Sequence, residues 1–110
     1  MALTPFEYVT SNSDGVMLMA RDEPMLVQAI IPTDAIDGFF DLRNASPFDR
    51  QTVVLANLEP IGRIAAGKYE RGELNYLDVA DLRVANIRVS LFDLKASGLL
   101  RSVGAQRPEA

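Results

Sequence analysis

The stretch SPFDRQTVVLANLEPIGRIAAGKYERGEL, residues 46–74, is the longest helix-like segment of the chain and organises the rest. Ser46 is a good N-cap, because its hydroxyl can accept a hydrogen bond from a backbone N–H of the first turn. Pro47 stands where a missing N–H costs nothing, and Asp49 favours the positive end of the helix dipole. Gly72 supplies a left-handed stop. These signals predict a helical region that begins at Pro47 and ends just before Gly72.

Apolar residues recur along this stretch at helical spacing, which predicts one buried face. The stripe consists of Phe48, Leu55, Leu58, Ile61, Ala65 and Tyr69, widened by Val54 and Ile64.

Pro60 interrupts the pattern, because proline inside a helix removes a hydrogen bond and clashes with the preceding turn. One reading is a single bent helix from Pro47 to Arg71. The other is two helices, with Pro60 in the first turn of the second and Asn57 as its cap. We favour a break or a sharp kink.

The chain of 110 residues has the size of one domain. Its apolar fraction of 48% is high for a small protein, so we expect a homodimer that covers leftover apolar surface. The absence of cysteine and histidine removes the common thiol and imidazole chemistry and the commonest transition-metal ligands. The first residues resemble neither a signal peptide nor a membrane span, so the expected compartment is the cytoplasm.

Two apolar runs, Val16 to Ala20 and Met25 to Ile31, flank a polar connection and predict a β-hairpin. Neither run alternates cleanly with polar residues, which indicates strands covered on both faces, with helices on one side and a partner on the other. We expect a strand or loop over residues 1–15, a single α+β domain over 16–101 and a flexible tail over 102–110.

A short helix is expected from Asp34 to Arg43, capped by Thr33. Ile36, Phe39 and Phe40 face inward in this helix, and Asp34, Asp37 and Asp41 line the other side. Three acids at such gaps could ligate a divalent cation, but a solvated helix face explains them better, so no metal site is predicted.

The C-terminal part predicts a strand from Leu74 to Val79, with Leu74 and Tyr76 on one face and Leu77 and Val79 on the other. Residues 84–92 fit a strand or a helix almost equally well, and we choose the strand. Residues 93–100 are expected to form a last helical turn. The expected fold is therefore α+β in two layers: a β-hairpin, then two or three helices and one or two closing strands.

Two segments carry a family resemblance: VMLMARDEPMLVQAIIPTDAI, which runs from a hairpin into a helix, and IGRIAAGKYERGELNYLDVADL, which runs from a helix into a strand. Together, with Asp34-Ala35, Lys68-Tyr69 and Ala80-Asp81, they resemble a family of small bacterial proteins called domain of unknown function 1488. The resemblance covers Val16 to Leu82. It implies a compact two-layer fold and no particular activity.

The sequence contains no phosphate loop, dinucleotide fingerprint or nucleophile elbow, and its acidic balance disfavours nucleic acid as a partner. We therefore expect a non-enzymatic, homodimeric protein-interaction or regulatory module without cofactor, metal or catalytic residues. The candidate interaction residues are Met17, Met19, Met25, Tyr69 and Tyr76. The alternative is a small-ligand binding protein with a pocket between sheet and helices and with Tyr69 and Tyr76 as polar handles.

Overall fold

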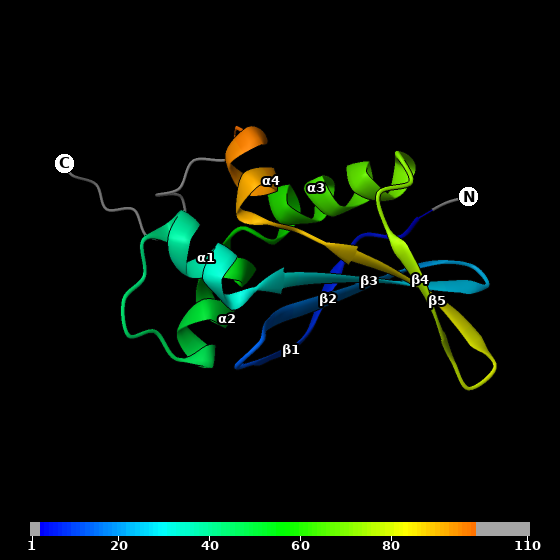
Figure 1. Ribbon diagram of the computed structural model, residues 1–110, viewed down its shortest axis with the longest axis horizontal. Helices are drawn as coiled ribbons and strands as arrows, with labels where there is room; N and C mark the ends of the chain where they lie inside the picture. Colours follow the sequence, from blue (N-terminus) through cyan, green and yellow to red (C-terminus); the bar gives the residue numbers. More distant parts are fainter. Residues whose placement is uncertain (1–2, 99–110) are drawn as a thin grey trace.

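A five-stranded sheet and four helices make up residues 3–98, the part of the chain that the computed structural model describes (Figure 1). The strands are β1 (Glu7–Asn12), β2 (Gly15–Asp22), β3 (Met25–Pro32), β4 (Asn75–Val79) and β5 (Leu82–Arg88). The helices are α1 (Thr33–Phe40), α2 (Pro47–Ala56), α3 (Leu58–Glu70) and α4 (Leu91–Ala96). The strand order is β1-β2-β3-β5-β4, and only β3 and β5 pair in parallel within the described chain. The predicted two-layer α+β fold is confirmed.

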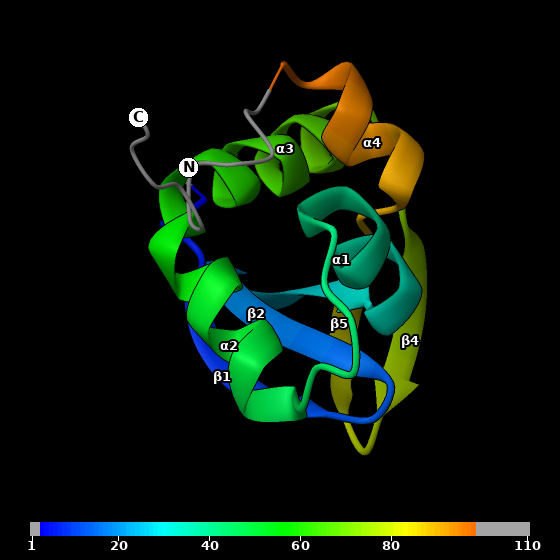
Figure 2. The same ribbon diagram turned by 90° about the vertical axis from the view of Figure 1, so that its left-hand side faces the viewer.

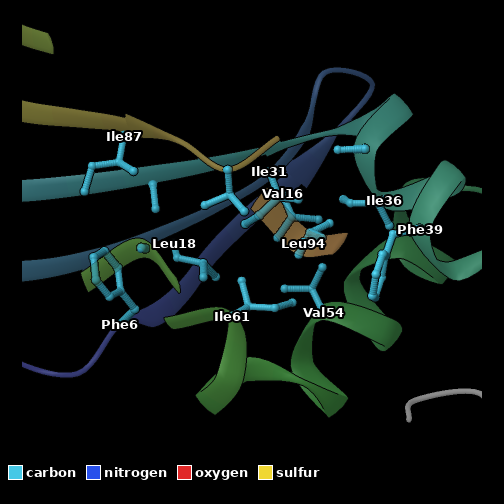
Figure 3. Close-up of a cluster of buried hydrophobic side chains, with 14 of the residues drawn as sticks. Phe6, Val16, Leu18, Ile31, Ile36, Phe39, Val54, Ile61, Ile87 and Leu94 are labelled. Atoms are coloured by element: carbon cyan, nitrogen blue, oxygen red, sulfur yellow. The ribbon is translucent and has the colours of Figure 1, made fainter. Parts of the chain in front are cut away.

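The helices lie against one face of the sheet (Figures 1 and 2). Helix α2 packs against β1 and β2, and α3 packs against β5. Alternate residues of β2 and β3 point into this layer, so Leu18 and Ile31 are fully buried. In Figure 3, Val54 and Ile61 of the helical layer lie opposite these strand residues. We call this side of the sheet the covered face.

The chain breaks between α2 and α3 at Asn57, as the proline predicted. Ser46 caps α2 as expected: its Oγ accepts from the Asp49 N–H at 3.1 Å, and an Asp49 oxygen accepts from the Ser46 N–H at 2.9 Å. Pro60 lies in the first turn of α3, where it costs little. The Asn57 side chain does not cap α3, because its Nδ2 donates back to the Val53 carbonyl at 2.8 Å.

The predicted apolar stripe is correct after this break and, before it, at Val54, which is fully buried in α2. Ile61 and Ala65 are fully buried, but Phe48 is 70% exposed and Leu55 is 41% exposed. The break at Asn57 resets the helical phase, so α2 buries a different face. The prediction that Phe48 and Leu55 share the buried face of α3 was therefore wrong.

The N-terminal strand belongs to the same sheet, because β1 pairs with β2 and Phe6 is part of the core. The expected boundary at residue 16 therefore does not separate it from the domain. The turn between β1 and β2 depends on Gly15, whose φ is 144°. A Cβ there would lie 2.1 Å from the Ile31 carbonyl oxygen, so no other residue fits without a backbone shift.

Helix α1 is shorter than predicted and ends at Phe40, because Asp41 takes the left-handed conformation at φ 56°. Thr33 is not its cap; its Oγ1 donates to the Ser13 carbonyl at 2.8 Å instead. The expected inward residues, Ile36, Phe39 and Phe40, are buried as predicted.

Near the C-terminus, β4 confirms the predicted strand, and β5 confirms the choice of a strand as far as Arg88. The last part of that prediction was wrong, because Ser90 caps α4 through a capping box with Asp93. Residues 99–100 of the expected last turn and the expected tail over 102–110 lie outside the described residues.

None of the helices within residues 3–98 combines the length and the apolar character that crossing a membrane requires.

Candidate interaction surface

No helix of residues 3–98 lies on the second face of the sheet, and apolar side chains gather on it. Residues that alternate with the core positions of each strand point to this side, which we call the open face. Its apolar members are Met17, Met19, Leu26, Ile30, Leu77, Val79, Leu82 and Val84. Leu77, Val79 and Leu82 are 43%, 56% and 51% exposed. These side chains lie on adjacent strands of the same face.

Val84 marks the middle of this surface. It is only 7% exposed, yet it is not part of the core cluster under the helices. The strand register places Leu26 on one side of it and Leu77 on the other. Val84 is therefore buried by its neighbours on the open face, which make a small apolar cluster of their own.

A polar pair crosses the same face. Gln28 of β3 stands next to Asn86 of β5, and its Nε2 donates to the Asn86 Oδ1 at 2.8 Å. Both side chains are half-buried. This hydrogen bond ties the two parallel strands together and leaves further amide donors and acceptors facing outward.

Two charged residues stand at opposite margins of the open face. Glu7 of β1 is beside Met19, and Arg88 of β5 is beside Ile30. Both are exposed, and neither side chain forms a hydrogen bond or an ion pair with another residue in the range 3–98. Each therefore has a free charge to offer a partner.

The structure brings together only two of the five predicted interaction residues. Met17 and Met19 lie on the open face, whereas Met25 points to the covered face and packs against the core. Tyr76 is 52% exposed on the other side of β4, with the Arg83 guanidinium 5.0 Å from its ring centre. Tyr69 lies in the helical layer.

Sequence reasoning missed Leu26, Ile30 and the buried Val84 as members of the open face. The alternation of side chains along each strand was a usable signal. Leu26 and Ile30 alternate with Val27, Ala29 and Ile31 and therefore point to the opposite face. This alternation assigns residues to two faces of the sheet, but it does not tell which of the two faces the helices cover.

The hydroxyl of Tyr69 donates to the Asp22 Oδ2 at 2.5 Å and so joins α3 to the end of β2. This hydrogen bond, with burial as the second cause, raises the pKa of Tyr69 to about 12. The hydroxyl is therefore a structural link and not a free polar handle for a ligand.

Lys68 and Asp93 form a second link, between α3 and α4, with the Nζ and Oδ2 atoms 2.7 Å apart. Burial alone would raise the pKa of Asp93, but hydrogen bonds from Lys68 and Ser90 outweigh it and hold that pKa below its ordinary value. Both links hold the covering helices in place.

The three acids of the first helix do not meet. Asp37 binds Arg50 with Oδ1 and Nε 2.9 Å apart, and Asp34 and Asp41 are exposed. Over the described residues, no group of three acids has the spacing to hold a metal ion.

A groove of about 830 Å³ runs between the segment before β1 and helix α3. Its walls are mostly apolar, with charged side chains at Glu59, Arg63 and Glu70. Tyr69 and Tyr76 do not line it. The groove is therefore separate from the open face and from the predicted polar handles.

Comparison of the chain with protein-family models, curated proteins and solved structures finds no match. The resemblance over Val16 to Leu82 stays a prediction.

Proposed function

We propose that this chain is a cytoplasmic, non-enzymatic protein-interaction module of the bacterial type that the resemblance implies, and that it works as a homodimer through its open face. The observation that carries the proposal is the apolar surface of Met17, Met19, Leu26 and Ile30 on a sheet whose other face is already covered. Water next to such a surface is unfavourable, and a second protein surface removes it.

A second copy suits this face because the face carries both signs of charge. Glu7 lies at one margin and Arg88 at the other. Two copies placed face to face can satisfy both charges without any other partner.

The size of the face supports association of moderate strength. At a strand spacing of about 4.8 Å and a rise of about 3.4 Å per residue, four strands of seven residues cover roughly 20 Å by 24 Å. Two such faces bury on the order of 1,000 Å², which is the lower end for a specific interface. We therefore expect dimers that dissociate on dilution.

The proposal is tested by light scattering on Met17→Glu beside a control variant, Leu55→Glu. Met17 lies on the open face, and Leu55 is an exposed apolar residue of α2 in the helical layer. We expect Met17→Glu to be monomeric and Leu55→Glu to dimerise like the wild type. A monomeric wild type, or equal dimerisation of both variants, would contradict the proposal.

A second candidate function, binding of a small apolar ligand, is favoured by the groove beside α3. Its volume of about 830 Å³ is within the usual range for ligand pockets, and Phe6 and Leu58 supply apolar walls. Filling the groove by Ala66→Phe should remove any small molecule that native mass spectrometry finds on the purified wild type. If the wild type carries no bound molecule and does not bind the apolar dye anilinonaphthalene sulfonate, this candidate fails.

A further inference from the structure

The unpaired charges at the margins of the open face have a fixed spacing, which the strand register defines. Glu7 shares a row with Met19, Gln28 and Asn86. Arg88 lies one row further along, beside Ile30. Three strand-to-strand steps separate Glu7 from Arg88, or about 14 Å across the sheet. This distance is too long for an ion pair within one subunit.

Other exposed charges on nearby strands have partners in their own chain. Arg21 pairs with Glu23 at 3.7 Å, and Arg83 pairs with Asp78 at 3.5 Å. Arg88 shares a small hollow of about 230 Å³ with Asp34 but forms no ion pair with it. Among the charged strand residues of the described chain, Glu7 and Arg88 are therefore the two whose side chains have no partner.

We propose that the open faces of two copies stack about a two-fold axis parallel to the strands, between β2 and β3, and that Glu7 of each subunit pairs with Arg88 of the partner subunit. This inference rests on the proposed function. The rotation places β1 over the partner's β5 and β2 over the partner's β3. Each copy thereby supplies both halves of two identical contacts.

The distances allow these contacts. Stacked sheets lie about 10 Å apart, and one row along a strand is about 7 Å, so the two Cα atoms lie on the order of 12 Å apart. Extended arginine and glutamate side chains together span that distance. A two-fold axis across the strands would instead place Glu7 over the partner's β1 and would never bring it to Arg88.

The same arrangement gives the apolar side chains suitable neighbours. Met17 and Ile30 share a row on the two central strands. The rotation therefore places Met17 over Ile30 of the partner subunit at both symmetry-related positions. The apolar centre supplies the free energy of association, and the charge pairs at the rim fix the orientation.

A charge-swap experiment tests this geometry. In Glu7→Arg alone or Arg88→Glu alone, both pairs of the homodimer become like-charge contacts. We expect the dissociation constant of each variant to rise about tenfold or more. In an equimolar mixture of the two variants, every arginine meets a glutamate in the heterodimer. Native mass spectrometry should therefore detect the heterodimer at wild-type affinity.

Two further variants guard against misfolding and non-specific charge effects. The double variant Glu7→Arg/Arg88→Glu carries both substitutions in one chain and should dimerise like the wild type. The control Arg43→Glu changes an exposed charge between α1 and α2, away from the sheet, and should leave dimerisation unchanged.

The possible failures are distinguishable. If the wild type is monomeric, the proposed function fails. If the wild type dimerises but the single variants are unweakened, or the mixture and the double variant do not recover, the geometry is wrong and the proposed function stands.

Discussion

The covered and open faces of the sheet are made by the same strands, yet they differ in what buries them. Leu18 is fully buried under the helices, whereas Met19, one residue later, is on the face that no helix of the described chain covers. The buried strand residues of the covered face are all apolar, and the open face mixes apolar residues with the Gln28–Asn86 pair.

This difference explains the apolar runs in the sequence. A strand that is apolar on both sides predicts two buried faces. Here the chain supplies the cover for one of them, and we assign the cover of the other to a second copy. A face that is in contact with water before association is expected to carry polar as well as apolar side chains. The polar pair on the open face agrees with this expectation.

The largest difference in the free energy of unfolding is expected between the variants Leu18→Ala and Met19→Ala. Removing the Leu18 side chain leaves a cavity under the helices and should lower the free energy of unfolding by about 3 kcal/mol. Met19→Ala should cost less, about 1 kcal/mol, because its side chain is only half-buried in the monomer. Urea unfolding at low protein concentration measures both. Equal losses would show that the two faces are packed alike.

A smaller loss is expected for Asp93→Asn, which weakens the link between α4 and α3. Losing the charged cap and the Lys68 partner should cost about 2 kcal/mol at pH 7. The pKa of Asp93 is lowered in the folded state, so its contribution exists above the ordinary value of 3.8 and disappears as pH falls through the folded value.

Urea unfolding at several pH values should show the wild type and Asp93→Asn converging in acid. Asp41→Asn is the control, because Asp41 is exposed and its loss should change stability by less than about 0.5 kcal/mol. If the difference in unfolding free energy between the wild type and Asp93→Asn persists unchanged below the pKa of Asp93 in the folded state, the ion pair is not its cause.

The smallest effect is expected for Tyr69→Phe, which removes the link from α3 to β2. The loss should be about 1 kcal/mol at neutral pH. Because the pKa of Tyr69 is raised from 10.0 to about 12, the wild type keeps this contribution below pH 10 and loses it as pH rises toward 12.

Thermal unfolding between neutral and alkaline pH measures the Tyr69 contribution. Tyr76→Phe is the control, because Tyr76 is exposed in β4, and this variant should follow the wild type at every pH. If Tyr76→Phe and Tyr69→Phe show the same stability at every pH, the hydrogen bond of the Tyr69 hydroxyl does not stabilise the fold.

Much of the fold followed from local signals. The hairpin, the cap at Ser46 and the break before Pro60 depend on residues close in sequence, and all three are present. The parallel pairing of β3 with β5 was not predicted, because it joins residues such as Gln28 and Asn86 that are far apart in sequence. The spacing of hydrophobic residues predicts that a segment is a strand, but it does not predict which other strand lies next to it in the sheet.

The interaction surface was predicted less well. Met17, Met19 and Met25 were all chosen because they are methionines. The alternation of side chains along β3 places Met25 on the same face as the core residue Val27. The contribution of Val84 depends on its position between Leu26 and Leu77, which only the sheet order determines.

The most direct measurement is sedimentation equilibrium of the wild-type chain over a range of concentrations, from about 1 to about 100 μM for an interface of this size. Burial of the open face by a second copy predicts a mass of twice the single chain at the upper end, falling toward the single-chain mass on dilution. A single-chain mass at every concentration would contradict it.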